Sequence, residues 1–155
     1  MWKKIKPYVI SVLLALGVGG LSALITRNSM DIYEDIVKPS LAPPGFIFPI
    51  VWTILYTLMG LSAARVFVKS DGKIQSTGLG LYITQLIFNF AWPIAFFTFR
   101  AFLFSFVWLI ALWLLVLFMI IRFYRVSKGA ALLQIPYLVW LTFALYLNYM
   151  IYILN

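Results

Sequence analysis

Five long stretches without a charged side chain divide this sequence and limit its fold more than any other feature. They contain 20, 26, 26, 21 and 27 residues, and the charged residues that bound them are Lys6, Arg27, Lys38, Arg65, Lys73, Arg100, Arg122 and Lys128. A helix needs about 20 residues to span a hydrocarbon core of about 30 Å. Period-two alternation is absent, and the stretches are about twice as long as a barrel strand. The sequence therefore predicts an all-α integral membrane protein, one domain over residues 1–155 built as a bundle of five transmembrane helices.

Composition excludes the main alternatives. Only 10% of the residues are charged and 65% are apolar, whereas a soluble domain carries about 25% charged residues. Intrinsic disorder requires low hydrophobicity and high charge, so it is excluded as well. The chain has no cysteine and no histidine, which removes disulfides, thiol nucleophiles and Cys/His metal sites. We expect no metal site and no cofactor.

Positive charge indicates both a lipid partner and an orientation. The net charge of +8 would favour nucleic acid on a soluble protein, but here the charges sit at the ends of apolar stretches and favour anionic lipid headgroups. Nine of the twelve Lys and Arg residues fall on the N-terminal side: Lys3, Lys4, Lys6, Arg65, Lys69, Lys73, Arg122, Arg125 and Lys128. The positive-inside rule then predicts a cytoplasmic N-terminus and an outside C-terminus in a bacterial cell membrane.

The helices are expected at about 6–27, 46–68, 78–98, 102–124 and 130–153, and the connection at 28–45 is the only long one. Pro39, Pro43 and Pro44 stiffen this first loop. Long loops in compact folds are more often lids or binding loops than spacers. Apolar and aromatic residues in the loop favour a lid, although a simple spacer is the alternative: Ile32, Tyr33, Ile36, Leu41 and Phe46.

One face of the third predicted helix carries polar and aromatic side chains: Tyr82, Gln85, Asn89, Trp92 and Phe96. Their spacing of three and four residues places them together. Two carboxamides in a bilayer need hydrogen-bond partners, so this face is expected to meet protein or a cavity. Pro93 also leaves the carbonyl of residue 89 without its helical partner. Amides that merely join neighbouring helices are the alternative interpretation.

Matching faces occur on the second and fifth predicted helices, as Trp52 with Tyr56, and as Tyr137, Trp140, Ala144 and Asn148. Ordinary packing explains single aromatic stripes. Three such faces together suit a large, flat, mostly apolar ligand, such as a tetrapyrrole, a sterol or a polycyclic amide.

The remaining two helices are expected to have supporting roles. The stretch 102–124 is apolar nearly all round, so we expect it to face mainly lipid. Small residues at spacings of four on the first helix allow close approach of another helix, either within the bundle or across a dimer: Ser11, Ala15, Gly19 and Ala23.

No Asp or Glu lies inside a predicted span. Buried ionisable groups mark ion paths and proton relays, so their absence argues against a proton-coupled transporter or an ion pump. Conventional acid–base catalysis is disfavoured for the same reason. A passive facilitator remains compatible with the sequence.

Three separated motifs resemble the translocator protein family, also called the tryptophan-rich sensory protein or peripheral benzodiazepine receptor family. The first runs from the loop into the second helix: Lys38-Pro39, Pro43-Pro44, Phe48, Val51-Trp52 and Leu55-Tyr56. The second lies in the third helix: Leu81-Tyr82, Gln85-Leu86, Asn89 to Pro93 and Phe96-Phe97. The third lies in the fifth helix: Pro136-Tyr137-Leu138, Trp140, Phe143-Ala144 and Leu147-Asn148-Tyr149.

This resemblance implies a five-helix, usually dimeric protein that binds porphyrins such as protoporphyrin IX and ligands of the benzodiazepine and isoquinoline carboxamide types. The implied pocket lies between the helices under the first loop. Carried over by position, its walls are Tyr33, Trp52, Asn89, Phe90, Trp140 and Ala144. With the loop prolines and the aromatic faces, the candidate ligand-binding set also includes Pro43, Pro44, Tyr56 and Trp92.

Three functions follow from the resemblance, and we rank a receptor or sensor for tetrapyrroles first. A tetrapyrrole transporter or facilitator is one alternative. Light-dependent porphyrin breakdown is the other, because some bacterial relatives are credited with it, and its candidate catalytic residues are Trp52 and Trp140. The animal sterol motif ends in a basic residue after Asn-Tyr, but here Asn148-Tyr149 is followed by Met150. Cholesterol is therefore not an expected partner.

Overall fold

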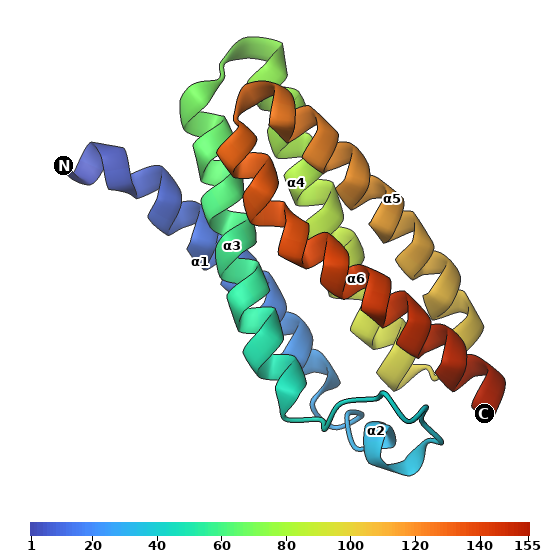
Figure 1. Ribbon diagram of the computed structural model, residues 1–155. Coiled ribbons are helices and arrows are strands. Elements are labelled where there is room, and N and C mark those ends of the chain that lie inside the picture. The colour runs from blue at the N-terminus through green and yellow to red at the C-terminus, as the bar shows by residue number, and fades with distance from the viewer.

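The computed structural model describes residues 1–155, and its regular secondary structure is entirely helical (Figure 1). Five helices are long and apolar enough to cross a membrane, which confirms the predicted fold class. They are α1 (Trp2–Thr26), α3 (Ile47–Lys69), α4 (Gly72–Pro93) with the π-helical turn η1 (Ile94–Thr98), α5 (Phe102–Val126) and α6 (Lys128–Leu154). A short helix not predicted from the sequence, α2 (Ile32–Asp35), lies in the first loop.

The first loop and the C-terminus lie at one end of the bundle, and the α3–α4 and α5–α6 turns lie at the other (Figure 1). The N-terminal end of α1 projects away from the other helices. Its first residues, from Trp2 to Lys6, are all exposed. The bundle core therefore depends mainly on α3 to α6, with α1 added along α3.

Glycine allows α1 and α3 to approach closely at two levels. A Cβ atom on Gly60 would lie 2.5 Å from the Val12 Cα, and one on Gly19 would lie 2.3 Å from the Tyr56 ring. Ala15, between these levels, is fully buried. The small residues on α1 were expected to pack either within the bundle or across a dimer. At Ala15 and Gly19 the structure shows packing within the bundle.

Helix α5 was expected to face mainly lipid, and the structure adds a protein-facing side that the sequence did not specify. One of its faces is buried in the core, through Leu109, Leu112, Val116, Met119 and Phe123. The helix is apolar on every side, so periodicity does not reveal which side packs against protein. Only the tertiary structure identifies that side.

Pro93 changes the hydrogen bonding where α4 ends. The backbone N–H of Ile94 donates to the carbonyl of Ala91 rather than to that of Phe90. The Phe90 carbonyl instead accepts a hydrogen bond of 3.1 Å from the Ser22 hydroxyl of α1. The chain then continues as η1, and π-helical turns of this kind are frequent at functional sites.

Candidate functional site

Two cavities adjoin beneath the first loop and share six lining residues: Tyr33, Phe48, Trp52, Asn89, Trp92 and Phe97. We treat them as the two lobes of one chamber. The outer lobe lies between α1, the first loop, α3 and α4 and holds about 480 Å³, within the usual range of about 300–1,000 Å³ for ligand sites. The inner lobe lies among α3, α4, α5 and α6 and holds only about 40 Å³. A ligand with several rings therefore fits the outer lobe, and side chains must move before it can enter the inner lobe.

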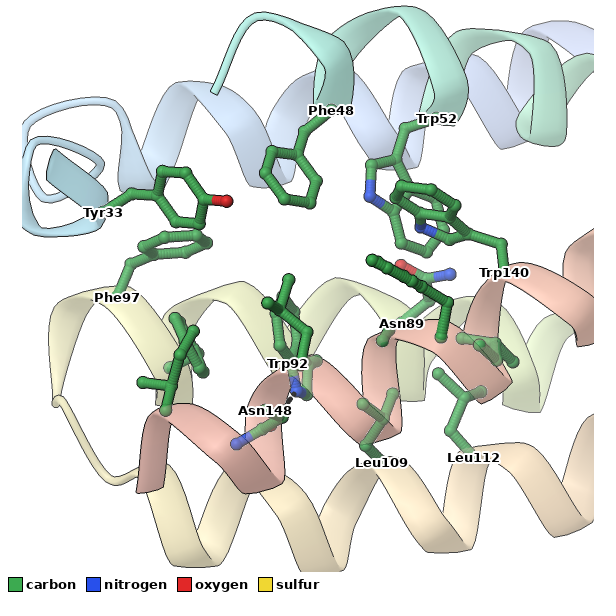
Figure 2. A pocket seen from close by; sticks show the side chains of 16 residues that line it. Tyr33, Phe48, Trp52, Asn89, Trp92, Phe97, Leu109, Leu112, Trp140 and Asn148 are labelled. Atoms are coloured by element: carbon green, nitrogen blue, oxygen red, sulfur yellow. Dashed lines mark hydrogen bonds between the residues drawn. The ribbon is translucent and has the colours of Figure 1, made fainter. Parts of the chain in front are cut away.

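Aromatic rings line the inner lobe, and each ring contacts the next to form a continuous row (Figure 2). Tyr33 meets the Phe48 ring edge-on at a centroid distance of 5.1 Å. Phe48 in turn meets Trp140 at 5.9 Å, and Trp140 stacks on Phe143 at 5.4 Å. Phe48, Trp140 and Phe143 are held by packing, so rotation of one of these rings changes the space available beside the next.

A network of hydrogen bonds connects the chamber lining with buried residues of the bundle core. The Tyr56 hydroxyl donates to the Asn89 Oδ1 at 2.8 Å, and the Asn89 Nδ2 donates to the Tyr137 oxygen at 2.7 Å. The Tyr137 hydroxyl then donates to the Gln85 Oε1 at 2.8 Å. Both carboxamides thus join helices, as the alternative interpretation stated. Asn89 also lines both lobes, so it combines the two roles.

A second polar contact fixes the orientation of Trp92. Its indole N–H donates to the Asn148 Oδ1 at 3.1 Å (Figure 2). The Asn148 Nδ2 donates to the carbonyl of Phe102 at 2.9 Å, at the start of α5. The Trp92 ring also stacks on Phe96 at 4.9 Å. Asn148 therefore positions one aromatic wall of the chamber.

The first loop reaches into the chamber through Tyr33, which is only 6% exposed. The Tyr33 hydroxyl donates to the Pro43 carbonyl, and the Lys38 ammonium donates to the Tyr33 carbonyl. Burial, and then the nearby Glu34 carboxylate, raise the pKa of Tyr33 above its ordinary value. The phenol therefore stays protonated, as a donor, at neutral pH.

The far side of the loop is tied to the end of α6. The Val37 backbone N–H donates to the Asn155 Oδ1 at 3.0 Å, and the Asn155 Nδ2 donates to the Val37 carbonyl at 2.8 Å. Two loop residues expected to support a lid, Leu41 and Phe46, are instead largely exposed. The buried apolar contacts of the loop come mainly from Ile32 and Tyr33.

Seven of the ten predicted site residues line the chamber. Tyr33, Trp52, Asn89 and Trp92 border both lobes, Tyr56 only the outer lobe, and Trp140 and Ala144 only the inner lobe. Pro43, Pro44 and Phe90 lie outside the lining. Pro43 instead accepts the Tyr33 hydrogen bond, and the Phe90 carbonyl accepts the bond from Ser22.

Sequence reasoning did not place several lining residues at the site. These include Phe48 and Phe97 at the centre, Leu109 and Leu112 from α5, and Gly19, Gly20, Ser22 and Ala23 from α1. Phe48 and Phe97 stood in the family motifs and were available from that signal. The α1 and α5 residues carry no polar or aromatic pattern that distinguishes them from ordinary packing.

The lining provides stacking surfaces and a few hydrogen-bonding groups. Its only charged residues are Asp31 and Glu34, both on the first loop and bordering the outer lobe. No group of three or more His, Cys, Asp or Glu residues is placed to hold a metal ion. A site of this kind suits a flat apolar molecule with polar edges.

Comparison with known proteins identifies the family of this chain. Residues 10–154 match the model of the TspO/MBR family. The chain is 38% identical to the tryptophan-rich protein TspO of Chlorobaculum tepidum, with 100% of this chain and 99% of that protein covered. It is 36% identical to the protein of the same name from Archaeoglobus fulgidus, with 95% of each covered. It is also 34% identical to the translocator protein of Homo sapiens, with 84% of this chain and 79% of the human protein covered.

Proposed function

The chain belongs to the TspO/MBR family, and from that premise we propose that it is a membrane receptor that binds tetrapyrroles such as protoporphyrin IX in the chamber under the first loop. Ligands of the benzodiazepine and isoquinoline carboxamide types share the same requirement for a flat, mostly apolar site. They are proposed to compete for the chamber.

The observation that carries this proposal is the aromatic lining of the chamber around an outer lobe of about 480 Å³. Trp52 and Trp92 border both lobes, and Trp140 faces the inner lobe. Offset or edge-on contacts between aromatic groups contribute about 0.5–1.5 kcal/mol each beyond the burial of area. Asn89 and the Tyr33 hydroxyl supply polar groups beside these rings.

Tryptophan quenching tests the proposal directly. Titration of the protein in lipid nanodiscs with protoporphyrin IX is expected to give saturable quenching beyond that of empty nanodiscs. Trp52→Phe and Trp140→Phe should each change the bound-state signal more than Trp113→Phe. Trp113 lies outside the chamber, where its indole N–H donates to the Thr142 hydroxyl at 2.9 Å. Quenching that never saturates, or that is equal for all three variants, would remove the basis for a receptor.

Light-dependent porphyrin breakdown is a second candidate, favoured by the surroundings of Trp52. Its ring lies 5.5 Å from the Tyr56 ring and 6.2 Å from the Tyr137 ring, measured between centroids. A catalytic role for Trp52 and Trp140 is tested by illuminating the complex and following the porphyrin spectrum. Equal loss in wild type and in the double Phe variant would exclude the protein from the reaction.

Transport, orientation and assembly remain proposals about an integral membrane protein of this family. Facilitated movement of tetrapyrroles is tested by porphyrin flux into sealed vesicles with and without the protein.

The excess of Lys and Arg on one side supports a cytoplasmic N-terminus in a bacterial cell. Formation of a homodimer is expected from the family and is tested by the mass of the protein in detergent.

A further inference from the structure

The residues that line the outer lobe differ in exposure according to the element that carries them. Those from α4 and η1 are buried or half-buried: Asn89, Trp92, Pro93 and Phe97. Exposed lining residues occur on α1, on α3 and in the first loop: Gly20, Ala23, Met30, Asp31, Glu34, Pro49 and Thr53. The outer lobe therefore opens on the side where α1 faces α3.

The way α1 crosses α3 explains this opening. The two helices are tightly packed where Gly60 meets Val12 and where Gly19 meets the Tyr56 ring. Beyond Gly19, toward the first loop, the exposed lining residues of α1 are Gly20 and Ala23. A Cβ atom on Gly20 would have no neighbour within 4 Å. Small side chains thus leave a gap at the level where the chamber begins.

We infer that this gap is a lateral portal through which a membrane-dissolved ligand enters the chamber between α1 and α3, defined by Gly20, Ala23, Pro49 and Thr53. The inference rests on the proposed function and specifies the source of the ligand. All four residues belong to helices long and apolar enough to span the membrane. Their exposed surfaces therefore face acyl chains rather than water.

The opposite end of the opening is less suited to an apolar ligand. Asp31 and Glu34 border the outer lobe from the first loop, and a carboxylate loses hydration when an apolar ring displaces its water. The loop is also tied down by the Tyr33 bond to Pro43 and the Val37 bonds to Asn155. A flat, mostly apolar molecule is concentrated in the bilayer. Entry from the side therefore requires neither dehydration of these carboxylates nor release of the first loop.

Two glycines on α1 provide a matched kinetic test. Gly17 and Gly20 are both exposed and both lack neighbours within 4 Å of an added Cβ, but only Gly20 lines the chamber. Gly20→Phe is expected to slow association and dissociation of protoporphyrin IX in proteoliposomes by about tenfold each, because a narrowed path affects both directions. Because Gly20 also lines the chamber, the readout of the portal is the parallel fall of both rate constants and not the dissociation constant. Gly17→Phe should leave both rate constants unchanged.

The portal is wrong if Gly20→Phe associates at the wild-type rate, or if it weakens equilibrium binding only through faster dissociation. The second result would make Gly20 part of the chamber wall. Saturable binding by the wild-type protein in the same vesicles judges the proposed function separately.

A ligand-independent measurement tests the opening itself. The chain has no cysteine, so Leu16→Cys places a single spin label on a half-buried position of the outer lobe. The label should collide more with dioxygen, which concentrates in the bilayer, than with a water-soluble nickel chelate. Adding Gly20→Phe should lower the dioxygen collision rate, and adding Gly17→Phe should not. Dominant collision with the nickel chelate, or equal effects of the two variants, would overturn the portal even if porphyrin binding is confirmed.

Discussion

Single uncharged polar residues organise the interior of this protein. Asn89 accepts from Tyr56, donates to Tyr137 and borders both lobes of the chamber. An amide serves here because it both donates and accepts without the cost of a buried charge. The sequence identified Asn89 as a residue that needs partners, but the partners themselves are 33 and 48 positions away in the chain.

Asn89→Ala is expected to lower the free energy of unfolding by about 1–2 kcal/mol, because it leaves the Tyr56 hydroxyl without its acceptor in a buried site. Equilibrium unfolding in mixed micelles measures this change. Thr84→Ala is the control, since Thr84 is exposed and bonds only to Gly80 of its own helix. Equal effects of the two substitutions would show that the Asn89 network contributes little.

Tyr33→Phe is expected to raise the dissociation rate constant of a bound porphyrin by about two- to tenfold, because it removes one hydrogen bond worth about 0.5–1.5 kcal/mol. The ring and its contact with Phe48 remain. Stopped-flow displacement measures the rate. An unchanged rate would mean that the bond to Pro43 does not hold the loop over the ligand.

The raised pKa of Tyr33 also predicts the pH dependence of the wild-type rate. A phenol with a raised pKa is protonated below the ordinary value of about 10, so its stabilising bond is present there and is lost as pH rises through the higher pKa. Dissociation should therefore be flat from about pH 6 to about pH 9. A step within that range would assign control of the loop to another group.

At the scale of the helices, the packing of α1 against α3 depends on glycine, whereas the packing of α5 depends on large apolar side chains. Gly60 and Gly19 permit a close crossing, whereas Leu112, Val116 and Met119 of α5 fill the core. Helix pairs in membranes are stabilised by close van der Waals contact, so small residues at the crossing matter as much as large ones.

Gly60→Ala is expected to destabilise the protein by about 1–3 kcal/mol, because its Cβ would lie 2.5 Å from the Val12 backbone and α1 would have to move. Gly17→Ala is the control at an open position of α1. There the better helix propensity of alanine should be neutral or stabilising by up to about 1 kcal/mol. Unfolding in mixed micelles compares the two, and similar values would contradict the close crossing.

For the whole molecule, the uneven charge distribution predicts one orientation in the membrane. Ser40→Cys in the first loop and Ser70→Cys in the α3–α4 turn lie at opposite ends of the bundle. In intact bacterial cells, a membrane-impermeant maleimide should label Ser40→Cys and should label Ser70→Cys only after lysis. The reverse pattern would invert the predicted topology.

The sequence predicted the family, the five helices and seven of the residues that line the chamber. The long uncharged stretches fix the helices because a backbone in lipid must satisfy its own hydrogen bonds. The spacing of Gln85, Asn89 and Trp92 fixed one polar face because a helix repeats every 3.6 residues. These properties are local, so they can be read without knowing how the helices pack.

Only the tertiary structure decided how the helices meet. It turned Leu109 and Leu112 of α5 toward the chamber, placed Phe90 outside the lining and brought Gly20 and Ala23 to the outer lobe. It also divided the chamber into a lobe of about 480 Å³ and one of about 40 Å³. Apolar side chains carry no directional signal, and the volume between helices depends on contacts between residues far apart in the chain.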